Sequence, residues 1–207
     1  MLDTDEYRSA GLQRRQVLIA YAAIVLAGAA LMAAVPSLTG SFSFYFYLLM
    51  WVALASGINI MAGFTGYVAF GYVAFFGLGA YATAILAGKL QWPLLLALLG
   101  AGVTGVVASL VFSRMLALRG IYFSMVSLAI AVICRALISL APADVAGGAH
   151  GLTLVSALNP RLAYYSMLAL ALATICVAFW IRLSRFGRHL AAIRDDMEAA
   201  QVAGLDV

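Results

Sequence analysis

Few residues of this chain have side chains that could do chemistry, and the most unusual of them lie in long apolar stretches. Arg135 stands in one such stretch, and Asn59 stands in another, shortly before Gly63 and Gly66. An arginine in an apolar segment either extends its guanidinium outward to water or faces a protein interior, where it could attract a carboxylate. Asn59 either bonds a freed backbone carbonyl or faces a substrate. These four residues are the candidates for a substrate pathway.

Serines in the same stretches raise the question of an intramembrane hydrolase, which needs a nucleophile beside a base. Ser124, Ser127 and Ser139 are in or near these stretches, whereas His150 and His189 are not. The chain contains no Gly-x-Ser-x-Gly elbow. It also contains no His-Glu-x-x-His motif and no Gly-x-x-x-x-Gly-Lys-[Ser/Thr] nucleotide loop. The sequence therefore predicts a protein that is not an enzyme, with no catalytic residue, metal, cofactor or nucleotide site of its own.

The composition of the chain indicates whether water or lipid surrounds these residues. Of the 207 residues 66% are hydrophobic and 10% are charged, against about a quarter charged in soluble proteins. Residues 16–88 include no Asp, Glu, Lys or Arg. The net charge of +4 forms no basic stripe interleaved with aromatics, so no nucleic-acid partner is expected. These features exclude a soluble enzyme and a disordered linker, and they predict a protein embedded in a lipid bilayer.

The apolar stretches have the length of membrane-spanning helices, since about 20 residues cross a bilayer core of about 30 Å. They do not alternate between apolar and polar residues as the strands of a membrane barrel would. The expected fold is an all-α polytopic membrane protein with about six transmembrane helices, preceded by segment 1–16 and followed by segment 182–207. The expected spans are 17–35, 42–62, 64–87, 93–112, 121–141 and 162–181.

The basic residues predict the orientation, because loops on the cytoplasmic side carry an excess of Lys and Arg. With the N-terminus in the cytoplasm, the outer segments hold only Lys89 and Arg161. All of the other basic residues outside the spans then lie on the cytoplasmic side. They are Arg8, Arg14, Arg15, Arg114, Arg119, Arg182, Arg185, Arg188 and Arg194.

The third stretch is unusually rich in glycine, which loosens a helix by about 1 kcal/mol per residue. One interpretation is close packing of helices against small residues. The other is a broken helix at Gly63 to Gly66, because irregular backbone at membrane depth is tolerated where it is buried or lines a cavity. Such breaks often mark transport pathways. The glycines in question are Gly63, Gly66, Gly71, Gly77 and Gly79.

Segment 182–207 shows the periodicity of an amphipathic helix. Arg194 and Glu198 are four residues apart and could pair, and Gly204 is placed to end the helix. Taken from the residues alone, this pattern favours a helix lying on the membrane surface. The apolar face consists of Leu183, Phe186, Leu190, Ile193 and Met197.

Four motifs occur in an order that resembles the permease subunits of branched-chain amino acid (LIV-type) ABC transporters. The first is the glycine-rich run, and the second is LRGIYFSMVSLAIAVICRAL over residues 118–137. The third is GGAHGL over residues 147–152, and the fourth is SRFGRHLAAIRDDMEAAQVAGLDV over residues 184–207. The family usually has Gln, Ser and His in the glycine-rich run, where this chain has Tyr67, Ala69 and Tyr72.

The resemblance implies that segment 182–207 is a cytoplasmic coupling region. EAAQVAG, from Glu198 to Gly204, is similar to the turn that docks such permeases on their ATPase. The implied partners are two ABC ATPase subunits, a second homologous permease and an extracytoplasmic substrate-binding protein, all at the cytoplasmic (inner) membrane. The residues implied in ATPase coupling are Arg194, Glu198, Ala199, Ala200 and Gly204.

The implied function is translocation of branched-chain amino acids with energy from the partner ATPases. Permeases for urea or short amides are similar to this family and provide an alternative substrate class. The resemblance also implies that further helices follow Val207, so a non-transporting truncated remnant or a membrane scaffold is the other alternative.

Overall fold

The computed structural model describes residues 21–36, 39–118, 120–142, 147, 151–152 and 159–204. Within these residues the chain forms helices and no strands. Five helices are long and apolar enough to cross a membrane, and a shorter apolar helix, Tyr21–Pro36, precedes them in the described part. The expected all-α polytopic membrane fold is therefore confirmed.

The five long helices are named by their α-helical cores. They are α2 (Phe42–Ile58), α3 (Tyr72–Ala84), α4 (Leu94–Phe112), α5 (Ile121–Leu140) and α7 (Pro160–Leu183). A π-helical turn, Asn59–Gly63, extends α2, and a second one, Ile85–Lys89, extends α3. A 3₁₀ turn, Ser113–Ala117, follows α4.

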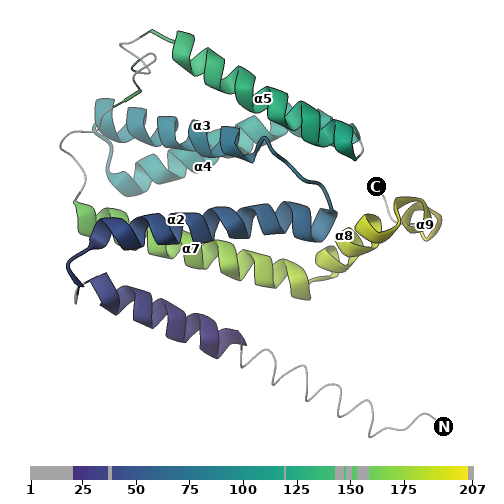
Figure 1. The fold of residues 1–207 in the computed structure, drawn as a ribbon, viewed down its shortest axis with the longest axis horizontal. Helices are drawn as coiled ribbons and strands as arrows, with labels where there is room; N and C mark the ends of the chain where they lie inside the picture. Colours follow the sequence, from purple (N-terminus) through teal and green to yellow (C-terminus); the bar gives the residue numbers. More distant parts are fainter. Residues whose placement is uncertain are drawn as a thin grey trace, which may run out of the picture.

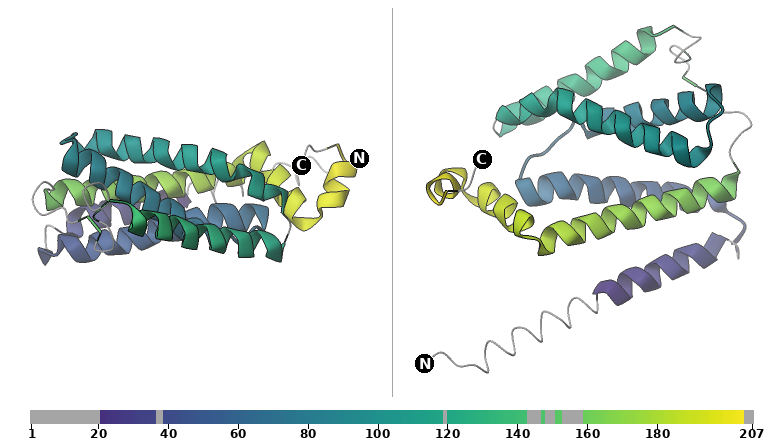
Figure 2. Two further views of the ribbon diagram at one scale, coloured as in Figure 1. Left: turned by 90° about the horizontal axis from the view of Figure 1, so that it is seen from above. Right: turned by 180° about the vertical axis from the view of Figure 1, so that it is seen from behind.

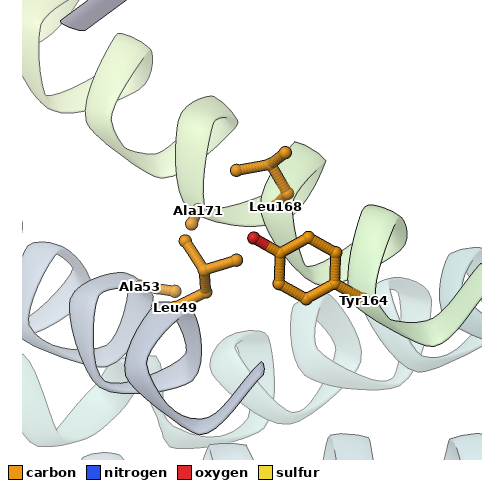
Figure 3. Close-up of a cluster of buried hydrophobic side chains, with 5 residues drawn as sticks. All are labelled: Leu49, Ala53, Tyr164, Leu168 and Ala171. Carbon is orange, nitrogen blue, oxygen red and sulfur yellow. The ribbon is translucent and has the colours of Figure 1, made fainter. Parts of the chain in front are cut away.

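The helices pack as two groups (Figures 1 and 2). In one group α2 lies along α7, and in the other α3 packs against α4 and α5. Leu49 and Ala53 of α2 meet Tyr164, Leu168 and Ala171 of α7 in a buried cluster (Figure 3). Small alanines on both helices let their backbones approach, which is the usual way helices associate in lipid.

Successive long helices run in alternating directions, so the bundle has two distinct ends (Figure 1). One end holds the Gly63 end of the α2 segment, the start of α5 and the end of α7, together with the short helices α8 (Arg185–Asp195) and α9 (Met197–Val202). We call it the α8 end. The opposite end holds Lys89, in the turn after α3, and Arg161, at the start of α7.

The third expected span differs most from the structure. Residues 64–87 were expected to form a helix, whereas α3 begins only at Tyr72 and residues 66–69 are not helical. The physical reason is at Gly66, whose φ of +75° is incompatible with a right-handed helix.

The amphipathic segment also differs, since it forms two helices in place of one. Ser184 separates α7 from α8, and its hydroxyl caps α8 by accepting from the Gly187 N–H at 3.0 Å. Asp196 is extended and separates α8 from α9, where its carboxylate accepts from the Ala199 N–H at 3.0 Å. Both are residue types that compete with helix continuation by bonding backbone N–H groups. Gly204, at φ +82°, follows the end of α9.

Candidate functional site

The break between α2 and α3 is the most unusual feature of the backbone. The Gly66 N–H donates to the Ala62 carbonyl, but the next N–H, of Tyr67, turns away to the Thr65 hydroxyl at 3.3 Å. The carbonyl of Gly63, which an uninterrupted helix would pair with the Tyr67 N–H, is thereby freed for another donor. We call residues 66–71, which lie beyond this point, the connector.

Helix α5 holds the connector from one side through two serines. The Ser124 hydroxyl donates to the Val68 carbonyl at 2.7 Å, and the Gly71 N–H donates to the Ser127 hydroxyl at 3.3 Å. Irregular backbone in an apolar surrounding needs such partners, because each unpaired polar group there costs several kcal/mol. The two serines therefore allow the chain to be non-helical at this place.

The connector also lies very close to α5. The rings of Tyr67 and Phe123 meet edge to face, with 4.9 Å between their centroids. At Gly71 a side chain has no room, since a Cβ built there would be 2.5 Å from the Ser127 carbonyl oxygen. The glycine-rich segment thus combines the two expected roles, a break at Gly66 and close packing at Gly71.

Helix α8 holds the break from the other side. Nη1 of Arg194 donates to the Gly63 carbonyl at 2.8 Å, across 131 residues of sequence. The Nε and Nη2 groups of the same guanidinium donate to one carboxylate oxygen of Asp195 at 3.1 and 2.9 Å. The side chain of Glu198, with which Arg194 could pair by its spacing, lies outside the described residues. In the described part the guanidinium is paired with Asp195.

A cavity of about 380 Å³ opens at this junction. Its walls are residues 65–68, the start of α5 at 120–121 with Ser124, and residues 193–194 of α8. The backbone break, α5 and α8 therefore meet around one space at the α8 end of the bundle.

A second cavity, of about 440 Å³, lies between α3 and α5. Arg135 lines it together with Tyr81 and Ser139, and most of the remaining wall is apolar. Gly77 also lines it, with no atom within 4 Å of the position its Cβ would take. One guanidinium in a mostly apolar groove is suited to bind a single anionic group of a small amphipathic molecule.

The structure brings some of the candidate residues together and separates others. Gly63, Gly66 and Arg194 meet at the break, and Asn59 lies one turn earlier, with its Oδ1 2.6 Å from where a Cβ of Gly63 would be. Arg135 lies in the separate α3–α5 cavity.

The remaining candidates lie on or just beyond α9. Ala200 is buried, whereas Ala199 and Gly204 are exposed. Among the described residues, no group of His, Cys, Asp and Glu could hold a metal ion.

Sequence reasoning missed the part played by Ser124 and Ser127. It considered them only as nucleophiles, whereas both bond the connector backbone. Their spacing of three residues, which places both on one face of a helix, was the available signal.

Comparison with known proteins gives one finding. A family model described as "Branched-chain amino acid transport system / permease component" matches residues 40–207, and so covers α2 to α9. No curated protein and no solved structure matches this chain.

Proposed function

The chain belongs to the family of permease components of branched-chain amino acid transport systems, and we propose that it carries branched-chain amino acids across the cytoplasmic membrane as part of an ABC importer. The observation that carries this proposal is the family match over 40–207, which includes both the broken helix and the α8–α9 segment. Energy comes from partner ATPases, and the proposed mechanism is alternating access.

The end of the α8–α9 segment, helix α9 with the turn after it, is the proposed docking site for an ATPase. Its position at one end of the bundle, beyond the last long helix, supports this role (Figure 2). Glu198 and the exposed residues Ala199 and Gly204 form the contact, because alanine allows close approach and glycine allows a sharp turn. Ala200 is buried in this chain and supports the contact from within. Movement of a docked helix is a way to transmit a nucleotide-driven change into the membrane.

The other proposed partners are a second homologous permease, a second ATPase subunit and an extracytoplasmic binding protein that delivers the substrate. The pathway residues are proposed to be Asn59, Gly63, Gly66 and Arg135. Discontinuous helices commonly form substrate sites in transporters, and the interruption at Gly66 supports the inclusion of the glycines.

We propose an orientation in which the α8 end faces the cytoplasm, as does the N-terminus. The cationic residues of α8, Arg185, Arg188 and Arg194, support it, since the opposite end has only Lys89 and Arg161 among its described basic residues.

Cysteine labelling in intact cells tests this orientation. In a chain with Cys134 and Cys176 replaced by serine, a membrane-impermeant maleimide should label Gln91→Cys but not His189→Cys. Both positions are exposed, so side-chain burial does not distinguish them. Permeabilised cells, in which both positions should react, provide the control. Labelling of His189→Cys alone in intact cells would reverse the orientation.

Uptake by the purified complex tests the function. The chain, isolated from its own membrane with the proteins bound to it, is reconstituted into vesicles, and uptake of radiolabelled leucine, isoleucine, valine and urea is measured with and without ATP. We expect ATP-dependent uptake of the three amino acids. ATP-dependent uptake of urea alone would favour the amide class, and ATPase activity without uptake of any of the four would contradict the proposal.

A further inference from the structure

Arg194 is the residue of α8 that bonds the backbone at the break between α2 and α3. We infer that Arg194 is a positioning residue that joins the α8–α9 segment to the connector, so that α8 cannot be displaced without displacing the connector. The family resemblance implied that Arg194 contacts the ATPase. In the structure, its guanidinium bonds the backbone of the chain's own break between α2 and α3. The inference rests on the proposed function, in which an ATPase moves α8.

The donor and the acceptor of this hydrogen bond are well matched. Gly63 has a carbonyl freed by the break, and the carbonyl end of a helix carries partial negative charge. A guanidinium is well suited to this carbonyl, because a charged donor forms a stronger hydrogen bond than a neutral donor does. Arginine also has enough N–H groups in one plane to bond Gly63 and Asp195 at the same time. Lysine, a flexible point charge, cannot fix this geometry.

The aliphatic stem of Arg194 also fits closely on Gly66. A Cβ built on Gly66 would lie 2.8 Å from Cγ of Arg194, which is closer than real side chains approach. Gly66 is therefore required twice, for its positive φ and for the space that the stem of Arg194 fills. The guanidinium and the stem thus contact the break at two separate points.

The contacts continue beyond the break, from the connector to α5. The connector is bonded to α5 through Val68 and Ser124 and packed on it through Tyr67 and Phe123. Helix α5 carries Arg135 into the α3–α5 cavity. A contiguous set of contacts therefore runs from α8 through the connector to α5, along which a displacement of α8 can be transmitted. A direct measurement decides whether it is transmitted.

A distance measurement on the chain alone, without any partner protein, tests whether Arg194 joins α8 to the connector. Spin labels are placed at Val68→Cys on the connector and His189→Cys on α8, with Cys134 and Cys176 replaced by serine. We expect one narrow distance distribution, which Arg194→Ala broadens and Arg194→Lys broadens less. Arg188→Ala is the matched control, because among the described residues this exposed arginine of α8 bonds the nearby Leu183 carbonyl, at 3.4 Å, and not the break. An unchanged distribution in Arg194→Ala would overturn the inference.

Glycine variants test the contact between Arg194 and the break from the side of Gly66. Gly66→Ala should broaden the distribution, whereas Gly40→Ala should not. The two glycines share a positive φ, +75° and +72°, but no described residue beyond its chain neighbours has an atom within 4 Å of the Cβ position of Gly40. In the Arg194→Ala background, which lacks the stem, Gly66→Ala should add little further broadening. The same added broadening in both backgrounds would show that backbone strain alone is responsible and would count against the fit of Arg194.

Transport provides the functional readout. In the reconstituted complex we expect Arg194→Ala to lower uptake per ATP hydrolysed about tenfold, within the usual range of coupling between sites, while Arg188→Ala leaves it unchanged. Equal losses in both variants would overturn the role in coupling. If the wild-type complex neither hydrolyses ATP nor transports, the proposed function fails, and the spin-label comparison still decides whether Arg194 joins α8 to the connector.

Discussion

Uptake should fall on the order of a hundredfold when Gly204 is replaced by valine or Glu198 by alanine, while the assembled complex continues to hydrolyse ATP. Gly204 follows α9 at φ +82°, a conformation that costs an ordinary residue about 1–2 kcal/mol and a β-branched residue more. Apart from its chain neighbours, no described residue has an atom within 4 Å of its Cβ position. A side chain there would therefore act through the turn and the docked partner, not through a clash with the described part of the permease.

The matched control is Gly40→Val. Gly40 has a similar φ of +72° and equally open surroundings, but it precedes α2 at the other end of the bundle. Uptake and ATP hydrolysis are measured on the same vesicles, so that uncoupling is separated from loss of protein. Unchanged uptake in both the Gly204 and the Glu198 variants would contradict ATPase docking at α9.

Reversing the charge of Arg135 should have the second largest effect. We expect Arg135→Glu to lower leucine uptake at least tenfold, a loss equivalent to about 1.4 kcal/mol. A carboxylate in the mostly apolar α3–α5 cavity would repel the substrate carboxylate, and low polarity strengthens such interactions. Arg135→Lys keeps the charge and should retain most of the uptake.

The control for charge reversal is Arg161→Glu. Arg161 lies at the start of α7 near the Phe42 ring, 5.9 Å from its centroid, and outside this cavity. The substitution changes the net charge by the same amount, so equal losses in both variants would remove Arg135 from the pathway. If the complex transports urea, its uptake should resist Arg135→Glu, because urea carries no charge.

Much of the architecture could be predicted from the sequence. The apolar stretches 93–112 and 121–141 lie within one residue of α4, Leu94–Phe112, and α5, Ile121–Leu140. Bilayer thickness fixes the number of apolar residues a span needs, so hydropathy alone locates such helices. The glycines at 63 and 66 likewise indicated a break, because a break requires backbone freedom that only particular residue types provide.

Some boundaries could not be read from hydropathy. Residues 66–71 are as apolar as their neighbours, yet they form the connector and α3 begins only at Tyr72. The connector can be non-helical because Ser124 and Ser127 of α5 form hydrogen bonds with its backbone. Hydropathy measures the preference of residues for lipid and is insensitive to such bonds.

The sequence by itself determined the all-α membrane fold and the family resemblance, and it led to the residues that we propose for coupling. Only the tertiary structure decided that Arg194 bonds Gly63 and lies against Gly66. Periodicity relates residues three or four apart on one helix, and on that basis Arg194 could pair with Glu198. In the structure its guanidinium bonds the carboxylate of Asp195 and also the carbonyl of Gly63, which lies 131 residues away. The fold brings the end of α8 to the break, where one carbonyl is free to accept from the guanidinium of Arg194.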